Sequence, residues 1–404
     1  MLKLMQKITL PNGLTVIHQP KKSNSIVVEL QVNVGSNDEG AEERGISHFL
    51  EHLLFEGTEK RPTNQLISNE IESIGGDFNA YTTNERTCFY VKVLKKHFVL
   101  AAEIISDIMQ HSLFKEEHIE REKNVVMKEI DMINDEPRFY QWLFLQKNLF
   151  KNHPCRYPTY GDKAIIKNLT KQKICSYFKK HYRPENMTLS VVGDASGWRR
   201  VIAEKFIMER GNKTSQKKVK EYSAGKGQVV REKRKISNTY TVIGFKTVPR
   251  SHRDSYVLEV INGILGRGQS GRMFAEIRSR HGLAYDVGSQ NIGEITYGYF
   301  AVYATVDKKN VNLVKNLIDA EIGKLRQVTE KDLQEAKYFI EGNYLLELED
   351  TQKVADQILF WEQVSKASLM NSFVNQVKKV TVNDVKRVAS KYFRKGTLVV
   401  LEGK

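Results

Sequence analysis

The chain has 404 residues, of which 40% are hydrophobic and 27% are charged. This composition is that of a globular protein, and the length exceeds what one ordinary core holds, so we expect two domains or more. No apolar run approaches the roughly 20 residues that cross a bilayer, so we expect no membrane partner.

The net charge of +15 raises the question of a nucleic-acid partner, because 63 Lys and Arg residues face 48 Asp and Glu residues. The densest basic runs are KKVK at 217–220 and REKRK at 231–235, in a polar stretch with Gly and Ser. No aromatic residues are interleaved with these charges, as they are in surfaces that bind single-stranded nucleic acid. We therefore interpret the stretch as a solvated linker between domains and expect no nucleic acid. A basic nucleic-acid-binding protein is the alternative.

The N-terminal segment MLKLMQKITLPNGLTVIHQP has the pattern of two strands joined by a Pro-Asn-Gly turn, without a basic-then-apolar leader. The cysteines, Cys88, Cys155 and Cys175, are scattered and form no C-x-x-C pair. This argues against a disulfide framework and against a cysteine metal site. We therefore expect a cytoplasmic protein.

The sequence pattern repeats at an offset of about 210 residues, which is far longer than a solenoid period and indicates duplicated domains. In each copy a strand precedes two helices, an extended segment, a second strand, two long helices and a final helix–strand pair. The matched segments are 26–36 with 239–248, 45–55 with 254–265, 63–76 with 271–282, 77–83 with 283–289, 87–93 with 297–306, 99–109 with 311–325, 116–130 with 330–344 and 169–194 with 380–403.

Strands and helices that cluster without strict alternation predict an α+β fold, and strands with one apolar face predict mostly antiparallel sheets. We predict one domain at residues 1–211, a linker at 212–235 and a similar second domain at 236–404. The duplication is also an internal control, because a feature present in only one copy is a candidate for function.

The segment GISHFLEHLLFEGT at 45–58 places His48, Glu51 and His52 in an apolar helical run. Residues four apart share a helical face, so two imidazoles can aim at one point, a spacing that suits a tetrahedral metal ion. Glu51 borders that face and can sit beside a metal-bound water, as in the H-x-x-E-H arrangement. The second copy has apolar and neutral residues around Leu258 to Asn262, so the fold does not require the histidines.

A catalytic zinc site usually has three protein ligands, so a third ligand is expected from another segment. The best source is the predicted helix HIEREKNVVMKEI, where Glu122 and Glu129 are seven residues apart, two turns along one face. One of them could bind the metal while the other orients a histidine. The spacing does not decide which, and solvated glutamates on a helix surface are the alternative.

With these motifs the chain resembles the inverzincin metallopeptidases related to pitrilysin, insulin-degrading enzyme and mitochondrial processing peptidase. The resemblance rests on GISHFLEHLLFEGT, IESIGGDFNAYTT, EREKNVVMKEI, RPENMTLSVVGD and LGRGQSGRMFAEIRSRHGLAY, and it extends over nearly the whole chain. One departure is Glu56, where the family often has a basic or apolar residue. It affects no essential motif.

The resemblance implies one zinc ion per chain, held by His48, His52 and Glu129. It implies that Glu51 is the general base and that Glu122 orients a histidine ligand without binding the metal itself. These are the roles of a zinc-dependent endopeptidase that hydrolyses peptide bonds. The alternative is a non-catalytic subunit or scaffold, although such subunits typically lack one or more of the motif residues.

The resemblance also assigns substrate contacts. It implies that DFNAYTT is a sheet edge, where Asn79 and Ala80 pair with an extended peptide through backbone hydrogen bonds. In the second copy, Arg278 and Tyr285 match an Arg/Tyr pair that contacts the substrate carbonyl, and both are suitable donors for an oxyanion. From the residues alone, an ordinary strand, a surface arginine and a half-buried tyrosine are the alternatives.

The large members of the family have four such domains in one chain, whereas this chain has two. A closed chamber for extended peptides or unfolded segments then needs two chains, so we expect a homodimer, with a heterodimer with a related subunit as the alternative. The G-x-G-x-x-G pattern of Gly266, Gly268 and Gly271 follows a predicted helix rather than a strand. We therefore expect a glycine-rich loop beside Arg272 and no dinucleotide site.

Overall fold

The computed structural model describes residues 5–212, 214, 219, 221 and 227–403. The chain forms two compact units, and each unit is assembled from separate stretches of the sequence. Unit 1 comprises Met1–Asp131, Pro158–Lys217 and Glu347–Met370, and unit 2 comprises Met132–Tyr157, Lys218–Leu346 and Asn371–Lys404. Both units combine one sheet with several helices, so the predicted α+β class is confirmed.

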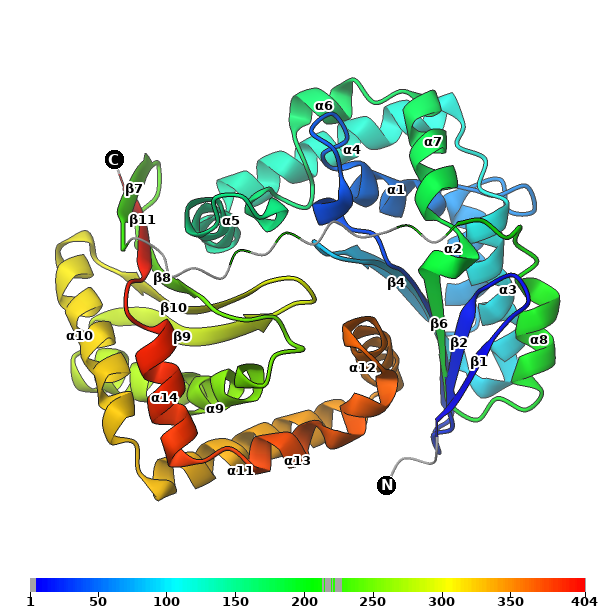
Figure 1. Cartoon of the computed structure of the whole chain (residues 1–404). Helices are drawn as coiled ribbons and strands as arrows, with labels where there is room; N and C mark the ends of the chain where they lie inside the picture. Colours follow the sequence, from blue (N-terminus) through cyan, green and yellow to red (C-terminus); the bar gives the residue numbers. More distant parts are fainter. Residues whose placement is uncertain (1–4, 213, 215–218, 220, 222–226, 404) are drawn as a thin grey trace. The chain divides into compact units, whose positions relative to one another are not determined.

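Unit 1 is built on a six-stranded mixed sheet with the order β1-β2-β6-β3-β5-β4 (Figure 1). β3 runs antiparallel to both of its neighbours, and β2 runs parallel to β6. In this register Leu30 lies between Phe89 and Leu189, so their apolar side chains share one face of the sheet. The strands are β1 (Gln6–Thr9), β2 (Thr15–Gln19), β3 (Ser25–Val32), β4 (Asp77–Thr82), β5 (Thr87–Leu94) and β6 (Met187–Val192).

Helices cover both faces of this sheet. α1 packs on β4 and β5, α3 packs on β3 and β5, and α12 packs on β3 and β6. Two neighbours on β4 show that these faces are opposite, because Thr82 bonds to α1 whereas Tyr81 bonds to Asp356 of α12. The α-helices with bounds in unit 1 are α1 (Ile46–Leu54), α2 (Asn64–Glu72), α3 (Phe98–Gln110), α4 (Glu116–Asp135, which ends in unit 2), α6 (Lys163–Lys167), α7 (Lys171–His181), α8 (Trp198–Lys205) and α12 (Thr351–Val364).

Unit 2 repeats the same plan with the strand order β7-β11-β8-β10-β9. β7 is parallel to β11 and the other pairs are antiparallel, which matches β2-β6-β3-β5-β4 strand for strand. The predicted duplication is therefore confirmed in topology. Its elements are α5 (Pro137–Leu149), β7 (Val229–Arg234), β8 (Thr239–Lys246), α9 (Asp254–Gly266), a π-helix (Phe274–Arg280), β9 (Ala284–Gly293), β10 (Gly298–Val306), α10 (Val311–Gly323), α11 (Glu330–Glu347), α13 (Phe373–Lys378), α14 (Val382–Tyr392) and β11 (Thr397–Gly403).

The two halves of the sequence exchange a helix. α5 is encoded in the first half but packs on β8 and β11 of unit 2, and α12 is encoded in the second half but packs on β3 and β6 of unit 1. The two helices occupy equivalent places, because β8 and β11 correspond to β3 and β6. Leu145 of α5 is fully buried and lies against Gly244, where an added Cβ would come within 2.6 Å of the leucine side chain. Each unit therefore needs both halves of the chain to complete its core.

The predicted linker at 212–235 falls partly outside the described residues. Its last part differs from the prediction, because residues 229–234 form β7. VVREKR alternates in exposure along this strand, and pairing with β11, with Val229 opposite Leu398, supplies partners for its backbone. Within the described part of the chain, no helix combines the length and hydrophobicity needed to cross a membrane.

Glycines with positive φ follow two helices. After α2, Gly75 adopts φ +71°, and after the π-helix, Gly282 adopts φ +62°. Both values lie in the left-handed region, where a glycine costs little and other residues are strained. The glycine-rich segment at 266–271 follows helix α9 rather than a strand, which is not the setting of a dinucleotide fingerprint.

The helix exchange predicts which unit a mutation in α5 destabilises. Leu145→Ala removes a fully buried side chain, so it should lower the free energy of unfolding by about 2–5 kcal/mol. In hydrogen-exchange mass spectrometry, the loss of protection should fall on β8 and β11, with β3 and β6 less affected. The opposite distribution would contradict the exchange.

Candidate metal centre

The side chain of Glu39 fixes helix α1 at its N-terminus. Gly45 begins the helix with φ +94°, and the Glu39 side chain accepts the backbone N–H groups of Gly45 at 2.7 Å and Ser47 at 2.9 Å. These are donors that a helix start leaves unpaired, and burial raises the pKa of the Glu39 carboxyl to about 8. Burial of the apolar face then fixes the rotation of α1. That face consists of Ile46, Phe49, Leu50, Leu53 and Leu54.

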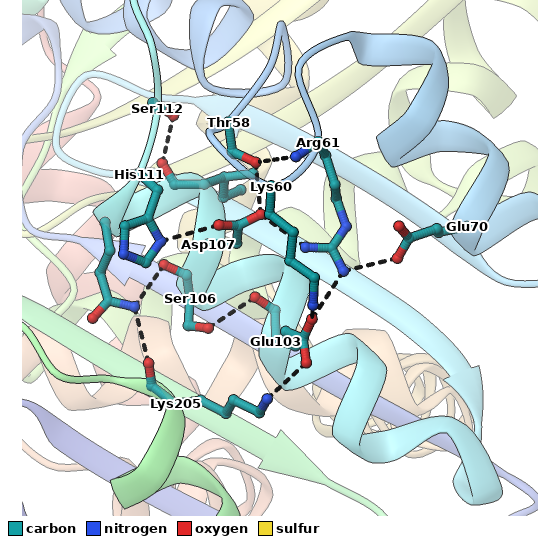
Figure 2. Close-up of polar contacts among 12 residues, drawn as sticks. Thr58, Lys60, Arg61, Glu70, Glu103, Ser106, Asp107, His111, Ser112 and Lys205 are labelled. Carbon is teal, nitrogen blue, oxygen red and sulfur yellow. Dashed lines mark hydrogen bonds and ion pairs between the residues drawn. The ribbon is translucent and has the colours of Figure 1, made fainter.

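The segment after α1 is tied to α3 by a buried ionic network (Figure 2). The Arg61 guanidinium donates to Asp107 at 2.8 Å, to Glu70 at 2.8 Å and to Glu103 at 3.1 Å. The Thr58 hydroxyl donates to the same Asp107 oxygen at 2.7 Å. Because a buried guanidinium is tolerated only with such partners, the network holds this segment in one place. α1 is thus anchored at both ends.

Two histidines of α1 meet one glutamate of α4. Glu129 Oε1 lies 3.6 Å from His48 Nε2, and Glu129 Oε2 lies 3.4 Å from His52 Nε2. One ligand atom from each of the three residues lies within 4.8 Å of the other two. Two imidazole nitrogens and one carboxylate oxygen that converge in this way fit the donor set of a catalytic zinc site.

Glu122 lies on the far side of His52. Its Oε2 is 3.4 Å from His52 Nδ1, and its side chain is only 8% exposed. A partner on Nδ1 fixes the ring so that Nε2 points toward Glu129. The spacing left open which glutamate faces the histidines' common point, and the structure places Glu129 there and Glu122 behind the ring.

The two histidines differ in their electrostatics. Burial, together with the nearby His52, lowers the pKa of His48 to about 4, so this ring is neutral at pH 7 and offers a lone pair. Burial also disfavours the charged form of His52, but hydrogen bonds to Glu122 and Glu129 outweigh it and raise the His52 pKa to about 10. The hydrogen bond to His52 in turn lowers the pKa of Glu129. Metal binding at His52 must therefore displace a proton.

Glu51 borders this cluster without joining it. Burial raises the pKa of the Glu51 carboxyl, and the Thr82 hydroxyl, which donates to its Oε2 at 2.5 Å, acts in the opposite direction. Thr82 is the last residue of β4, so the strand that packs beside α1 also orients this carboxylate. The result is a partly desolvated carboxyl group near His52.

β4 is an edge strand of its sheet, as predicted for DFNAYTT. Asn79 is exposed, and its Oδ1 accepts the backbone N–H of Ala80 at 2.8 Å. That N–H is therefore not used in the ladder with β5. The predicted pairing of Asn79 and Ala80 with a peptide remains a prediction.

Arg278 and Tyr285 belong to unit 2, whereas the histidines and glutamates belong to unit 1. Arg278 Nη1 donates to the Tyr285 carbonyl at 2.6 Å, and its guanidinium lies 5.5 Å from the centre of the Tyr285 ring. Tyr285 is 72% exposed, which is unusual for a large aromatic residue, so its hydroxyl can meet a ligand. The action of this pair on a substrate carbonyl remains a prediction.

The residues that support α1 leave little signal in the sequence. Glu39 lies six residues before the helix-starting glycine, so the usual N-cap position gives no signal for it. Thr82 lies inside a predicted strand, and only its face, opposite to that of Tyr81, brings it to Glu51. Arg61 would have been assigned to the surface, where arginines usually lie.

The chain is similar in sequence to a peptidase family and to proteins named zinc proteases. Residues 14–163 match the profile described as Insulinase (Peptidase family M16), and residues 168–338 match the one described as Peptidase M16 inactive domain. An uncharacterised zinc protease of Rickettsia felis is 31% identical, covering 98% of this chain and 96% of the relative. The uncharacterised zinc protease YmxG of Bacillus subtilis is 28% identical, with 96% of each chain covered.

The fold is also found in a solved structure. The crystal structure of a protease from Helicobacter pylori superposes with a TM-score of 0.93 over 100% of both chains, at 23% sequence identity. At this identity the likeness concerns the fold, and it supports the architecture of two similar α+β units.

The cluster predicts one divalent metal site per chain. Zn²⁺ should bind with a stoichiometry of about one, and His52→Ala should abolish binding because it removes one of three ligands. Glu122→Ala should leave the stoichiometry unchanged and weaken affinity about 10- to 100-fold. Competition with a chromogenic chelator measures both effects.

His281→Ala is the matched control for this experiment, because it removes an exposed histidine of unit 2. It should bind zinc as the wild type does. Equal zinc affinity in His52→Ala and His281→Ala would show that the cluster is not the metal site.

Proposed function

The chain belongs to the insulinase family, peptidase M16, and from this premise we propose that it is a zinc-dependent endopeptidase that hydrolyses extended peptides or unfolded segments. The observation that carries the proposal is the convergence of His48, His52 and Glu129, with Glu51 at its border. One zinc ion per chain fits these donors. It would supply a Lewis acid that acidifies water and polarises a peptide carbonyl.

The residues of α1 and α4 then have different roles in the reaction. His48, His52 and Glu129 hold the ion, and Glu122 keeps the His52 ring oriented through its Nδ1. Glu51 takes a proton from the attacking water and delivers it to the leaving amine. Its raised pKa supports this role, because a base whose pKa lies closer to neutrality can also return the proton.

β4 offers the substrate a place to bind. An extended peptide can add to a free sheet edge through backbone hydrogen bonds, which place little demand on its sequence. Asn79 and Ala80 lie on this edge, and Thr82 of the same strand bonds to Glu51. A peptide paired with β4 would therefore run beside the acid–base group.

Arg278 and Tyr285 complete the proposal as donors to the substrate carbonyl oxygen. One chain carries both this pair and the residues that would hold zinc. Two copies of the same chain are therefore sufficient to form a closed chamber. A homodimer and a cytoplasmic location are part of the proposal. Analytical ultracentrifugation tests the homodimer, and a monomer at micromolar concentration would contradict it.

Glu51→Gln tests the reaction. The variant should bind zinc like the wild type but lose the general base, so its kcat should fall by about 10²–10⁴-fold. A mixed peptide library, digested with and without a chelator and analysed by mass spectrometry, gives the rates. Wild-type cleavage should stop with chelator and return with zinc.

The library also separates the alternatives. Cleavage by Glu51→Gln at the wild-type rate would exclude Glu51 as the base. Absence of cleavage by the zinc-loaded wild type, with zinc bound, would favour a non-catalytic subunit or scaffold.

Arg278→Ala tests the contribution of unit 2. The variant loses a donor to the carbonyl oxygen, so kcat should fall by up to about 10²-fold while zinc content stays at one per chain. The exposed Arg280, which pairs with Glu276 on the same π-helix, provides the control Arg280→Ala with unchanged kcat. Loss of metal from Arg278→Ala would instead indicate a structural role.

A further inference from the structure

Among the histidines and glutamates of the GISHFLEHLLFEGT segment, only Glu56 has no role in the proposed mechanism. It follows α1 by two residues, and its carboxylate is almost buried, with its side chain 11% exposed. A carboxylate removed from water needs a partner of opposite charge. That partner is Arg121 of α4, whose Nη2 forms an ion pair with Glu56 Oε2.

Arg121 also contacts the glutamate behind the metal centre. Its Nε lies 3.6 Å from Glu122 Oε1, while the other oxygen of Glu122 lies 3.4 Å from His52 Nδ1. The four side chains thus form a continuous series from Glu56 through Arg121 and Glu122 to His52. One guanidinium stands between two nearly buried carboxylates, and each would repel the other without it.

We propose that Arg121, held in place by Glu56, is a positioning residue that keeps the Glu122 carboxylate against His52 and thereby sets the affinity of the metal centre. This inference rests on the proposed function only in assuming that the cluster binds zinc. It assigns no contact between Arg121 and metal or substrate.

The physical basis is the geometry of the guanidinium. Arg121 is 54% exposed, and an isolated exposed ion pair would contribute little. Here, however, Nη2 and Nε, which share one edge of the planar guanidinium, lie against two different carboxylates. The ion pair with Glu56 holds this edge in place, and the edge limits how far Glu122 can turn from the imidazole.

Zinc affinity in a set of four variants tests the proposal. Arg121→Gln should lower the affinity about 10-fold, the small end of the range for groups that support a metal ligand. Glu56→Gln should lower it less, because Arg121 keeps its charge but loses its anchor. The double variant should bind no more weakly than Arg121→Gln, because Glu56 acts through Arg121.

Lys123→Gln is the matched control. Lys123 is the other neighbour of Glu122 on α4 and carries the same charge, but its ammonium pairs with Glu120 at 2.7 Å. Its zinc affinity should stay within about twofold of the wild type. An equal loss of affinity in Lys123→Gln and Arg121→Gln would show that any lost positive charge has this effect, and it would overturn the proposal. Unchanged affinity in Arg121→Gln, or additive losses in the double variant, would also overturn it.

Two further readouts distinguish positioning from misfolding and from failure of the proposed function. At saturating zinc, kcat of Arg121→Gln should return to within about threefold of the wild type, whereas displacement of α1 or α4 would keep it low. Crystal structures of metal-free wild type and Arg121→Gln should show the Glu122–His52 contact kept in the first and lost in the second. A contact kept in both overturns the inference whether or not the protein is a peptidase. A wild type that binds no zinc refutes the proposed function separately.

Discussion

The meeting of α1 with α4 is the constraint on which the metal centre depends. Two imidazoles one helical turn apart supply two ligands for an ion, a catalytic zinc site usually has a third protein ligand, and Glu129 of α4 lies near both rings. This brings several ionisable groups into a partly desolvated space, where each needs a partner. Glu39 and the Arg61 network fix α1 at either end, so the histidines are held in position near Glu129.

The duplication separates what serves the fold from what serves the site. Both units have the same order for five strands, and in each unit an exchanged helix packs on the equivalent pair of strands. In unit 2, the sheet face that receives the exchanged helix is apolar around Val242. The residue at the matching position of unit 1 is Glu29, which is fully buried, and desolvation raises its pKa. The same strand order therefore accommodates an apolar residue or a buried carboxyl group at one position. The candidate metal centre is another feature that unit 1 has in addition to the shared fold.

The sequence predicted the site better than it predicted the assembly of the units. His48 and His52 follow from helical periodicity, and the edge position of β4 follows from the resemblance of DFNAYTT. The choice between Glu122 and Glu129 did not follow from spacing, because both lie on one helical face. Periodicity also could not show that α5 and α12 cover the other half's sheet, since an amphipathic pattern identifies a buried face but not its partner. Contacts such as Arg121 with Glu56 depend on how α4 approaches the segment after α1, and they leave no pattern in either segment.

The exchanged helix has a consequence for the order in which the protein can be made. The hydroxyl of Ser25, in the third strand, meets that of Thr351 across a sequence separation of 326 residues. Domains usually close in turn from the N-terminus as the ribosome extends the chain. Here the sheet beside His48 and His52 lacks α12 until about nine-tenths of the chain has been synthesised. The sheet therefore stays uncovered on one face through most of translation.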